Sequence, residues 1–237
     1  TRQLDLSIAS YDKGISYVEA LPVTDILIDS YLERSFANYL KTNDPAVYCI
    51  DRVKALNYAR QHSNLELLTK TLTQNAFCYE NANNFHIGIA LLDEALEILR
   101  PVLQDPSIIK IGQNVKYDTK IFARYDVNLA PVDDTMLLSY AINGGKHNHG
   151  MDYLSERYLN HKPISIKTLL GSGKSAITFD KVSINDAVNY AAEDADITLR
   201  LWKLFKPMLH ESSVTKVYET LERPLIPVLA KMEMNTI

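Results

Sequence analysis

The sequence predicts an α/β fold in which helices flank a mixed sheet. Three short apolar runs, at 65–71, 75–80 and 85–90, follow one another closely and are separated by asparagine-containing turns. This spacing is typical of an antiparallel meander. From residue 93 onward, helix-length apolar patterns alternate with short strand-like runs. A meander followed by such an alternation favours a mixed sheet with helices packed against it.

The residues before the meander are predicted to form an irregular lead-in, a helix, a short strand and a second helix. Residues 1–22 mix short apolar pairs with polar residues and are predicted to be an irregular lead-in. Apolar residues then recur at helical spacing over 24–40, with Thr24 in the position of an N-cap. A short strand is predicted over 46–50 and a helix over 51–61.

After the meander, the predicted elements are mostly helical. The helices cover 93–103, 116–125, 135–142, 151–160, 185–206 and 214–234, the last broken by Pro224 and Pro227. The strands cover 108–112 and 132–133. Asp134 directly precedes a predicted helix, and we expect it to cap that helix rather than to bind a ligand.

Composition and charge exclude several classes of protein. The chain has 237 residues, 46% of them hydrophobic and 23% charged, which are average values for a globular domain and exclude a disordered chain. The formal net charge of -4 excludes a generic polyanion binder, so any contact with nucleic acid must be local.

The cysteines and the apolar runs bear on the compartment. Cys49 and Cys78 have no metal-type spacing, and such sparse cysteine usage favours a reducing compartment, here the cytoplasm. No apolar run reaches the roughly 18 residues of a membrane span. The N-terminus lacks the order of a signal peptide and has the appearance of an internal cut.

Two local patterns are candidates for chemistry. Asn114 and Asp118 lie four residues apart directly after a predicted strand, and Tyr190 and Asp194 have the same spacing within a predicted helix. Side chains four apart share one helix face. Each pattern therefore aims one polar anchor and one carboxylate in the same direction.

Four ordered blocks carry a resemblance to a known family. They are IKIGQNVKYDTKIFARY, VDDTMLLSYAIN, GMDYLSERYL and DAVNYAAEDADITLRLW. With them, the sequence resembles the 3'-5' exonuclease (proofreading) domain of bacterial family A DNA polymerase I over about residues 46–237. The final ERPLIPVLAKMEMNTI resembles the first helix of the polymerase domain, which argues against a ribonuclease D-like RNA processor.

The resemblance implies a ribonuclease H-like (DnaQ-like) fold and two-metal phosphodiester hydrolysis. One Mg²⁺ or Mn²⁺ activates water and the other stabilises the leaving oxygen. By this resemblance, Tyr190 orients the attacking water and Asp194 binds the nucleophile-side metal. Asp118 helps to hold the second metal, and Asn114 lies near the terminal nucleotide of single-stranded DNA.

The family's Asp-x-Glu motif, which supplies two further carboxylates, has no counterpart in this chain. The preferred alignment places Thr69 and Thr71 where the family has the aspartate and the glutamate. A second alignment lets Glu80 stand for the aspartate but leaves Ala82 in place of the glutamate. A threonine hydroxyl is a poor Mg²⁺ ligand beside a carboxylate.

The missing motif leads to a specific expectation. Two carboxylates do not offset the charge of two divalent cations, so we expect weak metal binding and little or no hydrolysis. The expected module is a scaffold with weak DNA contact; the alternative is an active exonuclease that uses a substitute ligand such as Glu80. The expected organisation of this monomer is a linker or helical extension over 1–45, an exonuclease-like domain over 46–210 and the start of a polymerase domain over 211–237.

Overall fold

The computed structural model describes residues 2–81, 83–171, 173, 176–182 and 184–235, and divides the chain into two compact units, 1–101 and 102–237. None of the described helices is long and apolar enough to cross a membrane.

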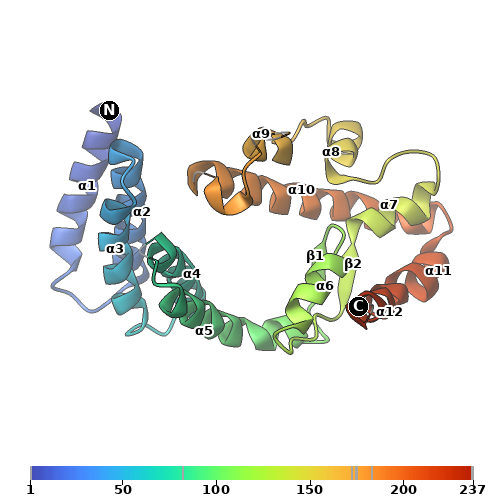
Figure 1. The fold of residues 1–237 in the computed structure, drawn as a ribbon, viewed down its shortest axis with the longest axis horizontal. Coiled ribbons are helices and arrows are strands. Elements are labelled where there is room, and N and C mark those ends of the chain that lie inside the picture. The colour runs from blue at the N-terminus through green and yellow to red at the C-terminus, as the bar shows by residue number, and fades with distance from the viewer. Residues whose placement is uncertain (1, 82, 172, 174–175, 183, 236–237) are drawn as a thin grey trace. The chain divides into compact units, whose positions relative to one another are not determined.

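Every element of the N-terminal unit in the described part is a helix. The helices are α1 (Arg2–Val18), α2 (Asp25–Thr42), α3 (Pro45–Ala59), α4 (Leu65–Asn81) and α5 (Phe85–Gln104). Helix α2 packs on both α1 and α3, and α3 packs on α4, so neighbours in sequence are neighbours in space (Figure 1). Two apolar clusters hold them together, one around Leu27, Tyr31 and Ala55 and the other around Leu72 and Leu91.

The predicted meander is wrong. Residues 65–71 and 75–80 lie within α4, and 85–90 form the first turns of α5. Leu72 and Ala76 of α4, like Leu91 and Ala95 of α5, are buried at four-residue spacing in one cluster. This is the helical period rather than the two-residue period of a strand.

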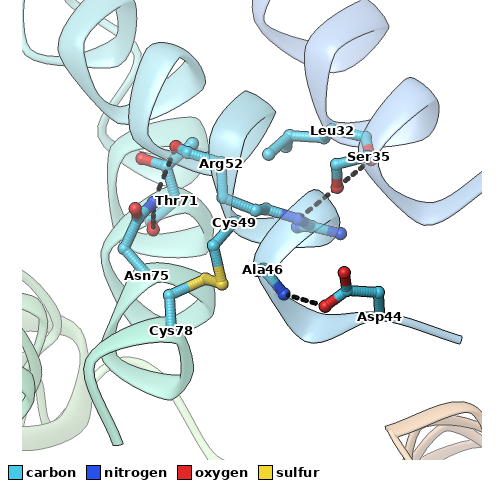
Figure 2. Close-up of a disulfide and its surroundings, with 9 residues drawn as sticks. All are labelled: Leu32, Ser35, Asp44, Ala46, Cys49, Arg52, Thr71, Asn75 and Cys78. Atoms are coloured by element: carbon cyan, nitrogen blue, oxygen red, sulfur yellow. Dashed lines mark hydrogen bonds between the residues drawn. A yellow bond between two sulfur atoms is a disulfide. The ribbon is translucent and has the colours of Figure 1, made fainter. Parts of the chain in front are cut away.

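Two further expectations for this unit are corrected. Residues 46–50 belong to α3, which begins at a proline behind the N-cap Asp44, whose carboxylate accepts the Ala46 N–H at 2.9 Å (Figure 2). The expectation of an irregular lead-in over 1–22 is wrong for residues 2–18, because they form α1, which buries Ile15. The N-cap predicted at Thr24 is confirmed, since its side chain accepts from the Leu27 N–H.

The C-terminal unit contains a two-stranded parallel sheet and most of its elements are helical. Strands β1 (Lys110–Gly112) and β2 (Val132–Asp134) pair with Lys110 opposite Val132 and Gly112 opposite Asp134. The mixed sheet therefore has no counterpart beyond this parallel pair in the described part of the chain. The remaining elements are α6 (Lys116–Ala123), α7 (Thr135–Asn143), α8 (Met151–Leu154), a π-helical turn η1 (Ser155–Leu159), α9 (Ile166–Leu170), a 3-10 turn η3 (Phe179–Lys181), α10 (Ile184–Glu211), α11 (Thr215–Val217), a π-helical turn η4 (Tyr218–Glu222) and α12 (Arg223–Asn235).

The last segment packs as part of this unit. Tyr218 is fully buried in the cluster that α10 forms with α7 and α8, and Ile226 is buried against β2. The expected break at the prolines does not occur, because α12 continues through Pro227. The π-helical turn directly before α12 shifts the hydrogen-bond register at the point where Pro224 lacks an N–H.

Candidate functional site

The turn after β1 is held by one buried carboxylate. Asn114 has a left-handed backbone conformation (φ 58°) and starts the turn into α6. The N–H groups of Asn114 and Val115 donate to the two oxygens of Asp134, both at 2.9 Å. Asp134 also accepts the Met136 N–H at 2.9 Å, so the prediction that it caps α7 is confirmed. Asp134 thereby fixes where the first turn of α6 lies.

The structure brings Asp118 and Asp194 to one pocket. Asp118 is in the first turn of α6, and Asp194 lies within α10. Both line a pocket of about 460 Å³, together with Ile111, Gly112, Gln113, Met151, Ala195, Thr198 and Leu199. Two carboxylates from segments about 75 residues apart thus share one concave surface.

Burial makes both carboxyls harder to ionise. It raises the pKa of Asp118 above its ordinary value. It also raises the pKa of Asp194, and the negative charges of Asp152 and Glu193 add to this effect. Oδ1 of Asp194 is buried without a hydrogen-bond partner among the described residues. A carboxylate in this state favours a proton or a cation.

Tyr190 is bonded to one of these acids. Its hydroxyl hydrogen-bonds to Asp194, and burial together with that carboxylate raises the pKa of Tyr190 to about 12. The phenol therefore stays protonated and donates to Asp194 at neutral pH. Asn114 is placed differently, since its exposed side chain lines a smaller pocket beside Asp134 and Leu225 rather than the pocket of the two acids.

The threonines predicted to replace the missing ligands are in a different setting. Thr69 and Thr71 lie on α4 in the N-terminal unit, and their hydroxyls donate to the carbonyls of Leu65 and Leu68 at 2.8 and 2.9 Å. Thr71 is fully buried. The predicted strand over 65–71, which would include both threonines, is wrong because these residues form the first turns of α4. Glu80 is also on α4, but its side chain lies outside the described residues.

One acid near the pocket was missed from the sequence. Asp152 is in the first turn of α8, and its charge raises the pKa values of both Asp194 and Tyr190. It lies in the block GMDYLSERYL, where its position in the first turn of a predicted helix was the available signal.

The donor set does not fit a pair of divalent cations. The pocket is lined by two carboxylates, whereas the resemblance implies four. Among the described residues, no group of three His, Cys, Asp or Glu side chains could hold a metal ion. Two acids that also face a phosphodiester leave most of the charge of two cations uncompensated.

Comparison with known proteins defines first the class and then the family. Residues 50–210 match a family model described as 3'-5' exonuclease, which is a class of nucleases. The chain belongs to the 3'-5' exonuclease domain family of family A DNA polymerase I.

Several curated relatives share this similarity. DNA polymerase I of Rhizobium leguminosarum is 52% identical over 144 residues, which are 61% of this chain and 14% of the relative. DNA polymerase I of Pseudomonas aeruginosa is 40% identical over 147 residues, 60% of this chain and 16% of the relative. DNA polymerase I of Borreliella burgdorferi is 28% identical over 203 residues, 82% of this chain and 22% of the relative. The chain thus matches less than a quarter of the length of each of these relatives.

Proposed function

We propose that this chain is a proofreading-type exonuclease module whose nuclease site has degenerated into a scaffold with weak contact to single-stranded DNA. The observation that carries the proposal is the pocket lined by Asp118 and Asp194, of which Asp194 is hydrogen-bonded to Tyr190. Among the described residues, no third carboxylate lines this pocket. Each Mg²⁺ or Mn²⁺ ion would be weakly held by a single acid.

The setting of α4 supports the same proposal. The hydroxyls of Thr69 and Thr71 are occupied by carbonyls of their own helix. Neither hydroxyl offers a charge to a cation.

In unit 102–237, we infer that β1, β2 and α10 represent part of a ribonuclease H-like core.

The parent protein follows from the relatives. We infer a cytoplasmic, monomeric DNA polymerase I that acts in replication and repair, in which residues 211–237 are the start of the polymerase domain. Within it, this module would touch the 3' end of a single strand near Asn114. With a net charge of -4, its affinity for DNA should be low and should fall as salt rises.

A nuclease assay tests the proposal. An end-labelled single-stranded oligonucleotide is incubated with excess protein and either Mg²⁺ or Mn²⁺, beside Asp194→Ala and Asp196→Ala. Asp196 is on the same helix but pairs with Arg200 at 3.2 Å, so it controls for a change in helix charge. We expect no metal-dependent shortening by any of the three proteins.

One result would favour the active alternative. Shortening by the unmodified chain and by Asp196→Ala, lost in Asp194→Ala, would show a working exonuclease with a substitute ligand. Glu80→Gln and Asp152→Asn would then identify that ligand. Fluorescence anisotropy with the same oligonucleotide tests the DNA contact separately, and Asn114→Ala should weaken it.

A further inference from the structure

The two cysteines of the chain are joined across a helix pair. Cys49 on α3 and Cys78 on α4 form a disulfide, with a Cα–Cα distance of 5.6 Å and a separation of 29 residues (Figure 2). Both helices belong to the N-terminal unit, which contains none of the acids in the pocket. Any role of this disulfide is therefore separate from the proposed nuclease site.

The two cysteine residues differ in exposure. Cys78 is buried at 8% relative exposure, whereas Cys49 is only half-buried. A reagent in solution therefore reaches Cys49 first. Thiol–disulfide exchange depends on access to the attacked sulfur.

A buried cation lies on the same face of α3 as Cys49. Arg52 follows one turn later, is 4% exposed and stacks over Tyr48 at 4.4 Å. Its Nε donates to Ser35 Oγ at 2.6 Å, and its Nη1 has no hydrogen-bond partner among the described residues. Arg52 thus links α3 to α2 one turn from Cys49.

The surroundings of Cys78 connect the bond to helix packing. Asn75, one turn before Cys78, is fully buried and donates to the carbonyls of Arg52 and Thr71, both at 2.8 Å (Figure 2). This side chain bridges α3 and α4 next to the disulfide. Loss of the covalent bond would leave these polar bonds and the apolar cluster around Leu72 to hold the two helices.

We propose that Cys49 and Cys78 form a reversible redox site that sets the stability of the N-terminal unit, with Cys49 as the sulfur that reagents attack first. In reduction, a thiolate of a dithiol attacks Sγ of Cys49, the S–S bond breaks, and Cys78 leaves as a thiolate that takes a proton from water. The second thiol of the reductant then displaces Cys49, which takes a proton, and the reductant becomes a cyclic disulfide. Two electrons pass from the dithiol to the protein.

Re-oxidation reverses these steps with a disulfide such as oxidised glutathione. The Cys49 thiolate attacks it, forms a mixed disulfide and releases one glutathione thiolate. The Cys78 thiolate then attacks Cys49 Sγ, forms the internal bond and releases the second glutathione thiolate. The oxidant gains the two electrons that the thiols lose.

The first test measures the bond and the order of attack in the full chain. After oxidised glutathione and blocking with N-ethylmaleimide, mass spectrometry should find the Cys49 and Cys78 peptides linked within one chain. In the dithiothreitol-reduced chain, N-ethylmaleimide should label Cys49 at least about tenfold faster than Cys78, because Cys49 is the more exposed of the two. Free thiols or links between chains after oxidation would overturn the site, and equal or reversed labelling rates would overturn the order of attack.

The second test measures stability. Dithiothreitol should lower the unfolding temperature of the N-terminal unit by on the order of 10 °C, the size expected for opening a loop of this length. The double variant Cys49→Ser, Cys78→Ser should melt like the reduced chain and ignore dithiothreitol. An unchanged melting temperature on reduction of the unmodified chain would overturn the proposal, and this measurement requires no variant to fold.

Discussion

The hydroxyl of Tyr218 donates a 3.0 Å hydrogen bond to Oδ1 of Asp133, and both side chains are fully buried. The same hydroxyl accepts the Asp134 N–H at 3.1 Å, and Trp202 Nε1 donates to the other oxygen of Asp133 at 2.7 Å. Lys206 pairs with Asp133 at 3.0 Å. These bonds from α10 and η4 thus hold β2 in place. They lie next to Asp134, which positions the first turn of α6, where Asp118 lines the pocket.

Tyr218→Phe should destabilise the C-terminal unit by about 1–3 kcal/mol, because it leaves the buried Asp134 N–H unpaired and removes a donor from a buried carboxylate. Urea unfolding followed by circular dichroism measures the change. Tyr117→Phe is the matched control, since Tyr117 is 58% exposed and its loss should cost less than about 0.5 kcal/mol. Equal effects of the two variants would contradict the role given to Tyr218.

Asp134→Ala should cost about 3 kcal/mol, because it removes a helix cap and leaves the N–H groups of Asn114 and Val115 without their acceptor. Asp44→Ala, which removes the exposed cap of α3 alone, should cost about 1 kcal/mol. Chemical unfolding compares the two. An Asp134 variant no less stable than the Asp44 variant would show that the turn after β1 does not depend on this carboxylate.

Lys110 caps backbone carbonyl groups, whereas Asp134 and Asp44 cap backbone N–H groups. Its ammonium donates to the carbonyls of Asp105 and Ile108 at 2.9 and 2.7 Å and also to that of Ala130. Lys110→Met keeps the aliphatic stem but leaves these acceptors unpaired, and should cost about 2 kcal/mol in thermal or urea unfolding. The exposed Lys203→Met serves as control and should be nearly neutral. A neutral Lys110 variant would contradict the capping role.

Asp194→Asn and Asp118→Asn should each stabilise the chain at neutral pH. The pKa of each acid is raised from 3.8, so the folded state binds its proton more tightly than the unfolded chain does. Ionisation therefore lowers stability as pH rises past the raised pKa, and this cost is absent below the ordinary pKa. The gain should be on the order of 0.5 kcal/mol at pH 7.5, because both groups are partly solvated, and should vanish near pH 3.

Urea midpoints at the two pH values measure this gain, with Asp196→Asn as the control that should show none. A loss of stability at pH 7.5 in Asp194→Asn would mean that the carboxylate is stabilised by a partner that the described residues do not include. Added Mg²⁺ should raise the midpoint of the unmodified chain little, since each ion would have a single acid to bind.

The helices and strands of the exonuclease blocks could be predicted because their signals lie in residues close together in the chain. Asp134 follows a strand and precedes an apolar helix, which is the pattern of an N-cap, and the structure confirms it. The strands at 110–112 and 132–134 and the 28-residue helix α10 likewise fall where periodicity predicted them. Short turns and strong periods fix such elements locally.

Helix α4 and the first turns of α5 were predicted as strands because their apolar runs are short and rich in β-branched or aromatic residues. The better signal was the four-residue spacing of Leu72 and Ala76 and of Leu91 and Ala95, which the structure buries in one cluster. A Cβ at Gly88 would lie 3.0 Å from the Ala76 carbonyl oxygen, so the close approach of α4 and α5 favours glycine there. The contact between α4 and α5 thus outweighed the β-strand propensity of these runs.

The sequence by itself determined the family, the cap at Asp134 and the candidate acids, because motifs and caps are set by residues close together in the chain. The tertiary structure decided which acids share a pocket, that residues after 211 belong to the core of the second unit, and that Cys49 meets Cys78. These facts depend on contacts between residues far apart in sequence, whose geometry is set by how helices pack against one another.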